Sequence, residues 1–294
     1  MEQPIVVEVT RGEVVEARHV VHAVAVLEGR IELAAGDPGL VTFLRSSAKP
    51  IQALPVVRAR PELDDAQVAL LCASHRATPQ QVAVVRRILA DAPATEAQLD
   101  CGAEPTRIAH NCSGKHAGFL ALCRAEGWEI AGYRHKAHPC QQAMLAEVAR
   151  AAEVDPSSLR LAVDGCGVPT FALTLERAAH AFTVWPTLDG GERVVRAMRA
   201  HPELLRGPVA ADVLLIRALD GWVAKGGAEG LFCARSGDGL GVALKVVDGS
   251  FRAIRPALAE LLARLSVEAR GLGGDKVLNS HGEPVGALRV VGSK

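Results

Sequence analysis

The sequence predicts an α+β fold in which one antiparallel sheet is built from both ends of the chain and the middle is mostly helical. Three observations support this. The first 45 residues are rich in valine and broken by short turns. The middle of the chain carries apolar residues at helical spacing, and glycine-punctuated, strand-like segments return near residue 228. Strands and helices segregated along a chain in this way favour a sheet with helices packed beside it.

The N-terminal segment is expected to form three strands. The stretches IVVEV, EVVEARHVVHAVAVL and IELAA are rich in β-branched residues, and the short sequences RGE, EGR and GDPG separate them. Alternating β-rich runs and turn residues are typical of antiparallel strands joined by short connections. This part of the chain therefore predicts a meander.

The middle of the chain is expected to form a series of amphipathic helices. Apolar residues recur at i, i+3, i+4 and i+7 in PIQALPVVRA, DDAQVALLCASH, PQQVAVVRRILADA, GKHAGFLALCRAEGW and CQQAMLAEVARAAEV. This spacing places them on one helical face. Further helices are expected at about 172–182, 191–200 and 210–219.

The C-terminal part returns to strands. The stretch AEGLFCARSGDGLGVALKVVDGS predicts two strands around a glycine-rich hairpin, RAIRPALAELLARLS another helix and PVGALRVVG a last strand. No proline- or serine-rich linker and no internal repeat divides the chain. We therefore expect residues 1–294 to form a single domain. Strands from 1–45 and 228–294 would make the sheet, and 46–227 a helical lobe.

Composition narrows the function classes. The formal net charge is zero and only 3% of residues are aromatic, which argues against a nucleic-acid partner. No apolar run is long enough to cross a bilayer, and no signal peptide is expected. Seven cysteines scattered singly do not resemble a disulfide framework. These features predict a cytoplasmic enzyme with reduced thiols that acts on a small molecule.

The first chemical signal is RSSAKP, residues 45–50. Ser46 and Lys49 are three residues apart, so a helix would place them on one side. Pro50 requires that helix to begin near Ser46, because proline fits only the first turn. A buried lysine can take the proton of a serine hydroxyl and so activate it for acyl transfer. The same spacing also suits a serine N-cap followed by a solvated lysine.

Two later segments extend this signal. Ser74, in CASHRATP, lies at the end of a helical segment, and Lys225, in VAKGGAEG, comes just before two glycines and a strand. A Ser-x-x-Lys serine, a loop serine and a lysine before glycines follow the order of the elements in penicillin-recognising acylases. Each residue also has a plainer interpretation, Ser74 as a hydroxyl at a helix end and Lys225 as a solvated turn residue.

A second lysine repeats the spacing behind a cysteine. Cys112 and Lys115 would share a helical face, and Cys166 lies between two glycines with Asp164 two residues before it. Two thiolates and a neutral amine would give zinc three ligands and leave a fourth position open. The alternative is that these are ordinary buried thiols, because free cysteine is among the most buried residue types.

Taken in order, these blocks resemble the rhizobial-type L-asparaginases. The resemblance is carried by RSSAKPIQALP, CASH, CGAEPTRIAHNCSGKHAGFLALC, HPCQQAMLAEVA, VDGCGVPTFAL and VAKGGAEGLFC, and it runs from the N-terminal meander to about residue 245. It implies a fold similar to serine β-lactamases and glutaminases, a homodimer, and hydrolysis of L-asparagine to L-aspartate and ammonia.

The resemblance also implies catalytic roles at the matching positions. Ser46 would be the nucleophile and Lys49 its base. Ser74 and Lys225 would form a second serine–lysine pair that completes a proton relay.

The same resemblance implies a metal site and a substrate pocket. A zinc ion that helps to position the substrate would be held by Cys112, Lys115 and Cys166. The pocket would be lined by Arg45, His116 and Asp164.

Two other functions remain open from the sequence. One is a different serine acylase of the β-lactamase-like fold, of the glutaminase or penicillin-recognising type. The other is a non-enzymatic zinc-binding protein, although a closed structural site needs four ligands and only three are apparent.

Overall fold

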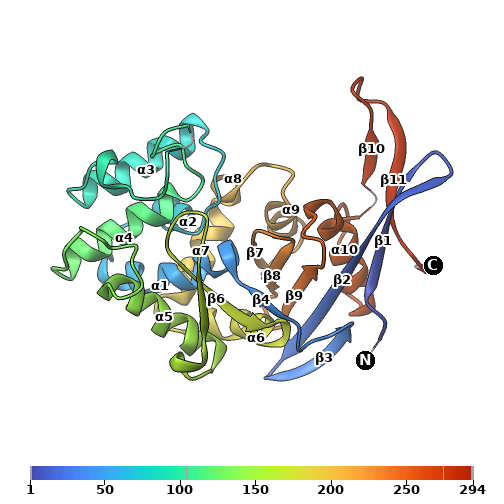
Figure 1. The fold of residues 1–294 in the computed structure, drawn as a ribbon, viewed down its shortest axis with the longest axis horizontal. Helices are drawn as coiled ribbons and strands as arrows, with labels where there is room; N and C mark the ends of the chain where they lie inside the picture. The colour runs from blue at the N-terminus through green and yellow to red at the C-terminus, as the bar shows by residue number, and fades with distance from the viewer. Residues whose placement is uncertain (1, 104, 274, 293–294) are drawn as a thin grey trace.

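The computed structural model describes residues 2–103, 105–273 and 275–292 and has a helical part on one side and a large sheet on the other (Figure 1). The N-terminal strands and the C-terminal hairpin lie side by side, far from helices α3 to α5. The α+β class predicted from the sequence is confirmed, because strands from both ends of the chain pair in one antiparallel sheet.

The large sheet has the order β10-β11-β1-β2-β9-β8-β7, and β3 pairs with β2 outside this path. Its strands are β1 Ile5–Arg11, β2 Val14–Leu27, β3 Arg30–Ala35, β7 Val223–Gly226, β8 Leu231–Arg235, β9 Gly241–Val246, β10 Lys276–Leu278 and β11 Pro284–Val290. Every neighbouring pair is antiparallel. The expected meander is therefore present, since β1, β2 and β3 pair in succession through short turns.

The ten α-helices of the described residues fall mainly between β4 and β7. They are α1 Lys49–Ala59, α2 Asp65–Leu71, α3 Pro79–Asp91, α4 Ser113–Ala125, α5 Pro139–Ala152, α6 Leu175–Val184, α7 Gly191–Ala200, α8 Pro202–Leu205, α9 Ala211–Ala218 and α10 Ile254–Arg264. Side chains at their starts explain several boundaries. Asp64 and Thr78 each accept a hydrogen bond from a first-turn N–H in a capping box, which fixes the first residues of α2 and α3.

A second, small sheet was not expected. It has the order β4-β6-β5, with β4 Val41–Phe43, β5 Arg160–Val163 and β6 Pro169–Thr174. The prediction that a helix covers 172–182 is wrong at its start, because Ala172 and Leu173 pair with β4 and Ala172 also pairs with β5. The Thr174 side chain accepts from Arg177 N and so caps α6, which begins one residue later.

The centre of the large sheet is covered on both faces. Strands β8 and β9 are buried at almost every position, rather than at alternate ones, which requires packing on both sides. Helix α6 packs against β2, β8 and β9, and α10 packs against β1, β9 and β11. Strand β7 ends the sheet and lies beside the helical part, so it brings the C-terminal half of the chain to the helices (Figure 1).

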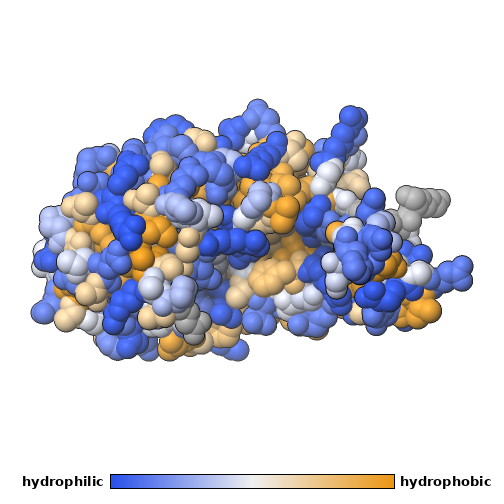
Figure 2. Space-filling model, turned by 90° about the horizontal axis from the view of Figure 1, so that it is seen from above, coloured by the Kyte–Doolittle hydropathy of each residue, from blue (hydrophilic) through white to orange (hydrophobic). Residues whose placement is uncertain are grey.

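One face of the molecule is mainly hydrophilic. Figure 2 shows polar side chains over most of one face, with apolar patches between the helical part and the part that carries the termini. No helix among the described residues is long and apolar enough to span a membrane.

The close approach of β11 to β1 gives a test of the sheet. Gly286 lies on β11, and a Cβ atom at this position would overlap the Thr10 carbonyl oxygen. We expect Gly286→Ala to lower the free energy of unfolding by roughly 2 kcal/mol, since added bulk in a packed contact forces the backbone apart. Urea unfolding of both proteins measures this.

The matched control is Gly39→Ala, whose Cβ would meet only the Asp37 carboxylate, at 3.2 Å. It should change the free energy of unfolding much less, because a flexible side chain can move aside. Equal stability of the two variants would show that β11 does not pack on β1 as described.

Candidate active site

The Ser46–Lys49 segment forms an irregular start of helix α1. Residues Arg45–Ala48 make a 3₁₀ turn, η1, that continues directly into α1. In a 3₁₀ turn residues three apart eclipse one another, and the Lys49 N–H donates to the Ser46 carbonyl. Arg45, at the start of the turn, adopts the left-handed φ of 48°. Ser46 and Lys49 thus follow one another on one side of the turn.

The two serines of this turn have different surroundings. Ser46 is half-buried, and its hydroxyl makes no hydrogen bond to any residue that the structure describes. Ser47 is fully buried, and its Oγ donates to the Lys225 carbonyl oxygen on β7 at 2.8 Å. Ser47 therefore attaches the turn to the edge of the large sheet and leaves the Ser46 hydroxyl available.

Two glycines after Lys225 allow this contact. A Cβ on Gly227 would lie 2.8 Å from the Leu44 carbonyl oxygen and 3.0 Å from Ser47 Oγ. A Cβ on Gly226 would lie 3.1 Å from Arg206 Nη1. The Lys-Gly-Gly sequence is thus needed where the turn and an arginine approach the strand backbone. Lys225 itself lies within β7, whereas the sequence suggested a position just before a strand.

Ser74 connects two buried lysines. Lys49 Nζ and Lys225 Nζ each lie 3.1 Å from Ser74 Oγ. Lys49 is 1% exposed and Lys225 is fully buried. Ser74 lies in the loop after α2, and its N–H donates to the Leu205 carbonyl, which holds the loop in place. The structure thus brings together three predicted residues from distant parts of the chain.

Burial changes the protonation of both lysines. Loss of hydration is the largest cause in each case, and it lowers the pKa of Lys49 and lowers the pKa of Lys225 to about 7. The Arg206 guanidinium is the next cause at Lys225, and its repulsion also favours the neutral amine. The buried Asp212 carboxylate, 3.6 Å from Lys225 Nζ, acts in the opposite direction. A neutral amine at neutral pH can accept a proton, as a catalytic base must.

The predicted metal ligands lie together at the start of α4. Cys112 is the residue before the helix, and Lys115 on its first turn places Nζ 3.2 Å from Cys166 Sγ. The two thiols and the amine are all buried. A hydrogen bond from Cys166 is the largest cause that holds the pKa of Cys112 well below its ordinary value, and it raises the pKa of Cys166. Cys112 is therefore the sulfur of this pair that more readily loses its proton.

The amine of this cluster is protonated. Burial favours the neutral form of Lys115, but the sulfurs of Cys166 and Cys112 outweigh it and raise its pKa. Among the residues described, no group of three or more His, Cys, Asp and Glu side chains is placed to hold a metal ion. Any metal here would have to use the Lys115 amine together with the two sulfurs.

The three predicted pocket residues take different positions. Arg45 Nε donates to Asp164 Oδ1 at 2.6 Å, so these two side chains form an ion pair beside Cys166. His116 is fully buried, and its Nδ1 lies 2.6 Å from the Tyr133 hydroxyl. Its Nε2 has no hydrogen-bond partner among the described residues.

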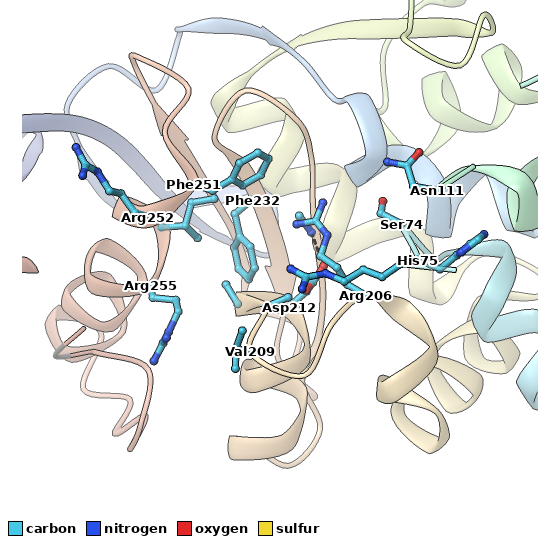
Figure 3. A pocket seen from close by; sticks show the side chains of 15 residues that line it. Ser74, His75, Asn111, Arg206, Val209, Asp212, Phe232, Phe251, Arg252 and Arg255 are labelled. Atoms are coloured by element: carbon cyan, nitrogen blue, oxygen red, sulfur yellow. Dashed lines mark hydrogen bonds between the residues drawn. The ribbon is translucent and has the colours of Figure 1, made fainter. Parts of the chain in front are cut away.

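A cavity of about 500 Å³ opens beside Ser74 (Figure 3). Its wall includes Ser74 and Gly226 at the lysine network, Arg206 in the middle and Phe251 at the far side. Sequence reasoning missed Arg206 and Asp212. Asp212 has the ordinary pattern of an acidic residue in a first helical turn, and nothing near Arg206 forms a motif. Only the fold brings them to Lys225.

Comparison with known families decides the identity of the chain. The model of the L-asparaginase II family matches residues 7–290, which is nearly the whole sequence. The chain belongs to the L-asparaginase II family. This confirms the resemblance carried by the sequence motifs. Membership in an L-asparaginase family supports an amidohydrolase that acts on asparagine.

Solved structures and curated proteins add little to the L-asparaginase II match. A β-lactamase from Mycobacterium bovis has 13% sequence identity and a TM-score of 0.36, over 84% of this chain and 95% of that chain. A similarity this weak bears on neither mechanism nor substrate. No curated protein matches the chain.

Proposed function

We propose that the protein hydrolyses L-asparagine to L-aspartate and ammonia, with Ser46 as nucleophile and Lys49 as its base. The observation that carries this proposal is the Ser74 hydroxyl between two buried lysine amines, in a chain of the L-asparaginase II family. A serine hydroxyl needs a neighbouring base before it can attack an amide. The buried lysines supply such a base because burial disfavours their charged form.

The proposed reaction has two steps. Ser46 Oγ attacks the side-chain amide carbon, and its proton passes to Lys49. The Ser46 N–H would stabilise the oxyanion, since the N–H groups of Arg45 and Ser47 already donate to Thr170 and Leu44. Such a donor is typically worth about 3 kcal/mol of barrier. A proton then moves through Lys49, Ser74 and Lys225 to the leaving nitrogen, and ammonia departs. Water next attacks the ester and gives one proton to Lys49, which passes it to Ser46 Oγ as the ester bond breaks, so that L-aspartate is released and the Ser46 hydroxyl is restored.

We further propose that Cys112, Lys115 and Cys166 hold a zinc ion. The support is their convergence: a Cys112 thiol whose pKa is held well below its ordinary value, and the Lys115 amine 3.2 Å from Cys166 Sγ. These side chains come from the start of α4 and the turn after β5. Sulfur and nitrogen are the donors that zinc prefers. When bound, zinc would supply a positive charge for orienting the substrate. Arg45 and Asp164, already paired beside Cys166, would line the same region, with His116 behind it.

Homodimer formation and a cytoplasmic location belong to the same proposal. The exposed apolar side chains Val41, Phe43 and Val163 on the small sheet give a surface that a second copy of the chain could cover. All seven cysteines are free thiols, as in proteins of a reducing compartment.

Replacing the two site serines separates their roles. We expect Ser46→Ala to reduce ammonia release from L-asparagine to background, because no nucleophile remains. Ser74→Ala should lower kcat about 100-fold or more while still forming an acyl-enzyme, since only proton transfer is impaired. Coupled ammonia assays and mass spectrometry of quenched enzyme measure these effects.

Ser157→Ala, on the surface, is the matched control and should keep full activity. A fully active Ser46→Ala enzyme would end the nucleophile assignment. An acyl group found on Ser74 in the wild-type enzyme would exchange the two roles.

The lowered pKa of Lys225 predicts the pH dependence. The neutral amine is the active form, and it is lost as pH falls through its pKa of about 7. We therefore expect kcat/KM for L-asparagine to fall on the acid side, with an apparent pKa near 7, and to level above it. The groups around Lys225 are Lys49, Arg206, Asp212 and the Cys112 sulfur, and Asp212 alone among the carboxylates favours its charged form.

Asp212→Asn should therefore move the acid limb to lower pH, because it removes the anion that stabilises the ammonium. The pH–rate profiles of the two enzymes measure the shift. If the acid limb of the pH–rate profile stays in place in Asp212→Asn, or shifts to higher pH, Lys225 does not control that limb.

Metal removal tests the zinc proposal and the non-enzymatic alternative together. We expect wild-type protein treated with a chelator to lose zinc and to bind L-asparagine more weakly, while remaining folded by circular dichroism. Cys112→Ala and Cys166→Ala should carry little zinc by elemental analysis. Cys123→Ala, a buried thiol on the same helix α4, should keep it.

Unfolding on chelation would favour a structural zinc protein instead. Ammonia release from glutamine, or rapid opening of a chromogenic cephalosporin, in preference to asparagine would favour the other serine acylases. Zinc retained by both site variants would rule out this metal site.

A further inference from the structure

Arg206 presents an unpaired guanidinium to the cavity beside Ser74. It follows α8, and Figure 3 shows its side chain in the middle of the pocket, between Ser74 and Phe251. Within residues 2–103, 105–273 and 275–292 its guanidinium makes no hydrogen bond and no ion pair, and only its backbone carbonyl is engaged, accepting from Gln81 Nε2 at 3.1 Å. The guanidinium lies over the face of the Phe251 ring, with Cζ 5.5 Å from the centroid. The five N–H donors of this planar guanidinium are therefore free to bind a ligand.

The exposed Arg76 also lines the cavity, and its guanidinium makes no hydrogen bond or ion pair to the described residues. The remaining charged groups of the cavity are already engaged. Arg255 pairs with Asp275 at 2.7 Å, and Arg252 Nε donates to His19 at 2.8 Å. Asp212 is close to Arg206, but its Oδ2 accepts from Gly226 N and faces Lys225, and its Oδ1 accepts from Val213 N. No ion pair joins Asp212 to Arg206 in the described part of the chain. Among the described residues, the cavity wall thus has two unpaired guanidinium groups, Arg206 and the exposed Arg76, and no free anion. Arg206 is the one that lies beside Gly226, next to Lys225.

Arg206 lies close to the lysine network. Its guanidinium lies beside Gly226, next to the buried Lys225, and it repels the charged form of that amine. Glycine at 226 is what leaves space for Nη1. An anion in the cavity would relieve this repulsion and would meet the guanidinium in the bidentate geometry that carboxylates favour. Arg45, the cation suggested by the sequence, is already paired with Asp164.

We propose that Arg206 binds the α-carboxylate of the substrate, so that the cavity between Ser74 and Phe251 is a carboxylate subsite. This rests on the proposed asparagine hydrolysis and deepens it. The substrate class is then amides of amino acids with a free α-carboxylate, and substrates in which that group is amidated or esterified are rejected. A volume of about 500 Å³ leaves ample space for such a small molecule.

The test compares two substrates and four enzymes. Initial rates are measured with L-asparagine and with L-asparagine amide, which lacks the carboxylate. The pH is about 9, well above the Lys225 pKa of about 7, so that a change in this pKa on loss of Arg206 affects the rates little. We expect Arg206→Gln to raise KM for L-asparagine about 10- to 100-fold, the usual effect of losing a charged hydrogen bond. Its kcat should change much less. Arg206→Lys should give a KM between those of wild type and Arg206→Gln, because lysine keeps the positive charge but cannot form two parallel hydrogen bonds to a carboxylate.

The decisive readout is the loss of discrimination. Wild-type enzyme should prefer L-asparagine over its amide by a similar 10- to 100-fold factor, and Arg206→Gln should treat the two nearly alike. Arg217→Gln removes an exposed arginine on α9, outside the cavity, and should behave as wild type. Unchanged KM in Arg206→Gln, or discrimination that persists, would overturn the proposal.

Calorimetric binding of L-aspartate separates this proposal from the proposed reaction, since it needs no turnover. Wild-type protein should bind L-aspartate at least tenfold more tightly than Arg206→Gln, a ratio that follows from the same charged contact. If wild type releases no ammonia but shows this difference, asparagine hydrolysis fails and the subsite stands. Equal binding by the two proteins, or none by either, would overturn the subsite.

Discussion

The burial of two lysine amines against one serine hydroxyl is the constraint on which the rest of this structure depends. Lys49 and Lys225 are almost fully removed from water, and both reach Ser74 Oγ at 3.1 Å. Two ammonium groups this close in a dry interior would repel strongly, so at least one must be neutral at neutral pH. The folded structure therefore holds at least one lysine amine in its uncharged form, in which it can act as a base. That is the chemical requirement of an enzyme whose nucleophile is an unactivated hydroxyl.

This arrangement exists only after the sheet has formed from both ends of the chain. Lys225 lies on the edge strand β7, which is connected through β8 and β9 to the long N-terminal strand β2. Ser47 then fastens the start of α1 to that edge, through a contact that Gly227 makes possible. Loss of the N-terminal strands would thus remove the support of a site that contains none of their residues. Catalytic groups carried by a rigid scaffold commonly depend on distant packing in this way.

Local patterns predicted the parts of the fold that local forces decide. Valine-rich runs between turns became β1 to β3, and Pro50 marked the start of α1 correctly because a missing N–H is best tolerated in the first turn. Pro55 does not end the helix, which continues through it to Ala59. The small sheet was missed because PTFAL has the composition of either element, and pairing with β4 and β5 decided for a strand. The spacing of Ser46 and Lys49 was visible in the sequence. Arg206 and Asp212 were not, since their meaning comes from contacts with Lys225, which no spacing encodes.

Lysines 115 and 225 show how neighbours, and not residue type, set the chemistry. Both are buried, yet their pKa values shift in opposite directions. The sulfurs of Cys166 and Cys112 raise the pKa of Lys115, whereas burial and the nearby Arg206 lower the pKa of Lys225 to about 7. The charge of Lys115 in turn favours the thiolate form of Cys112. In the proposed zinc site the metal would replace the protons of Cys166 and Lys115, because ligands must be deprotonated to bind. Zinc would then keep the local charge positive after Lys115 becomes neutral. The field felt by a substrate beside Arg45 and Asp164 would therefore change little, while its orientation would become fixed.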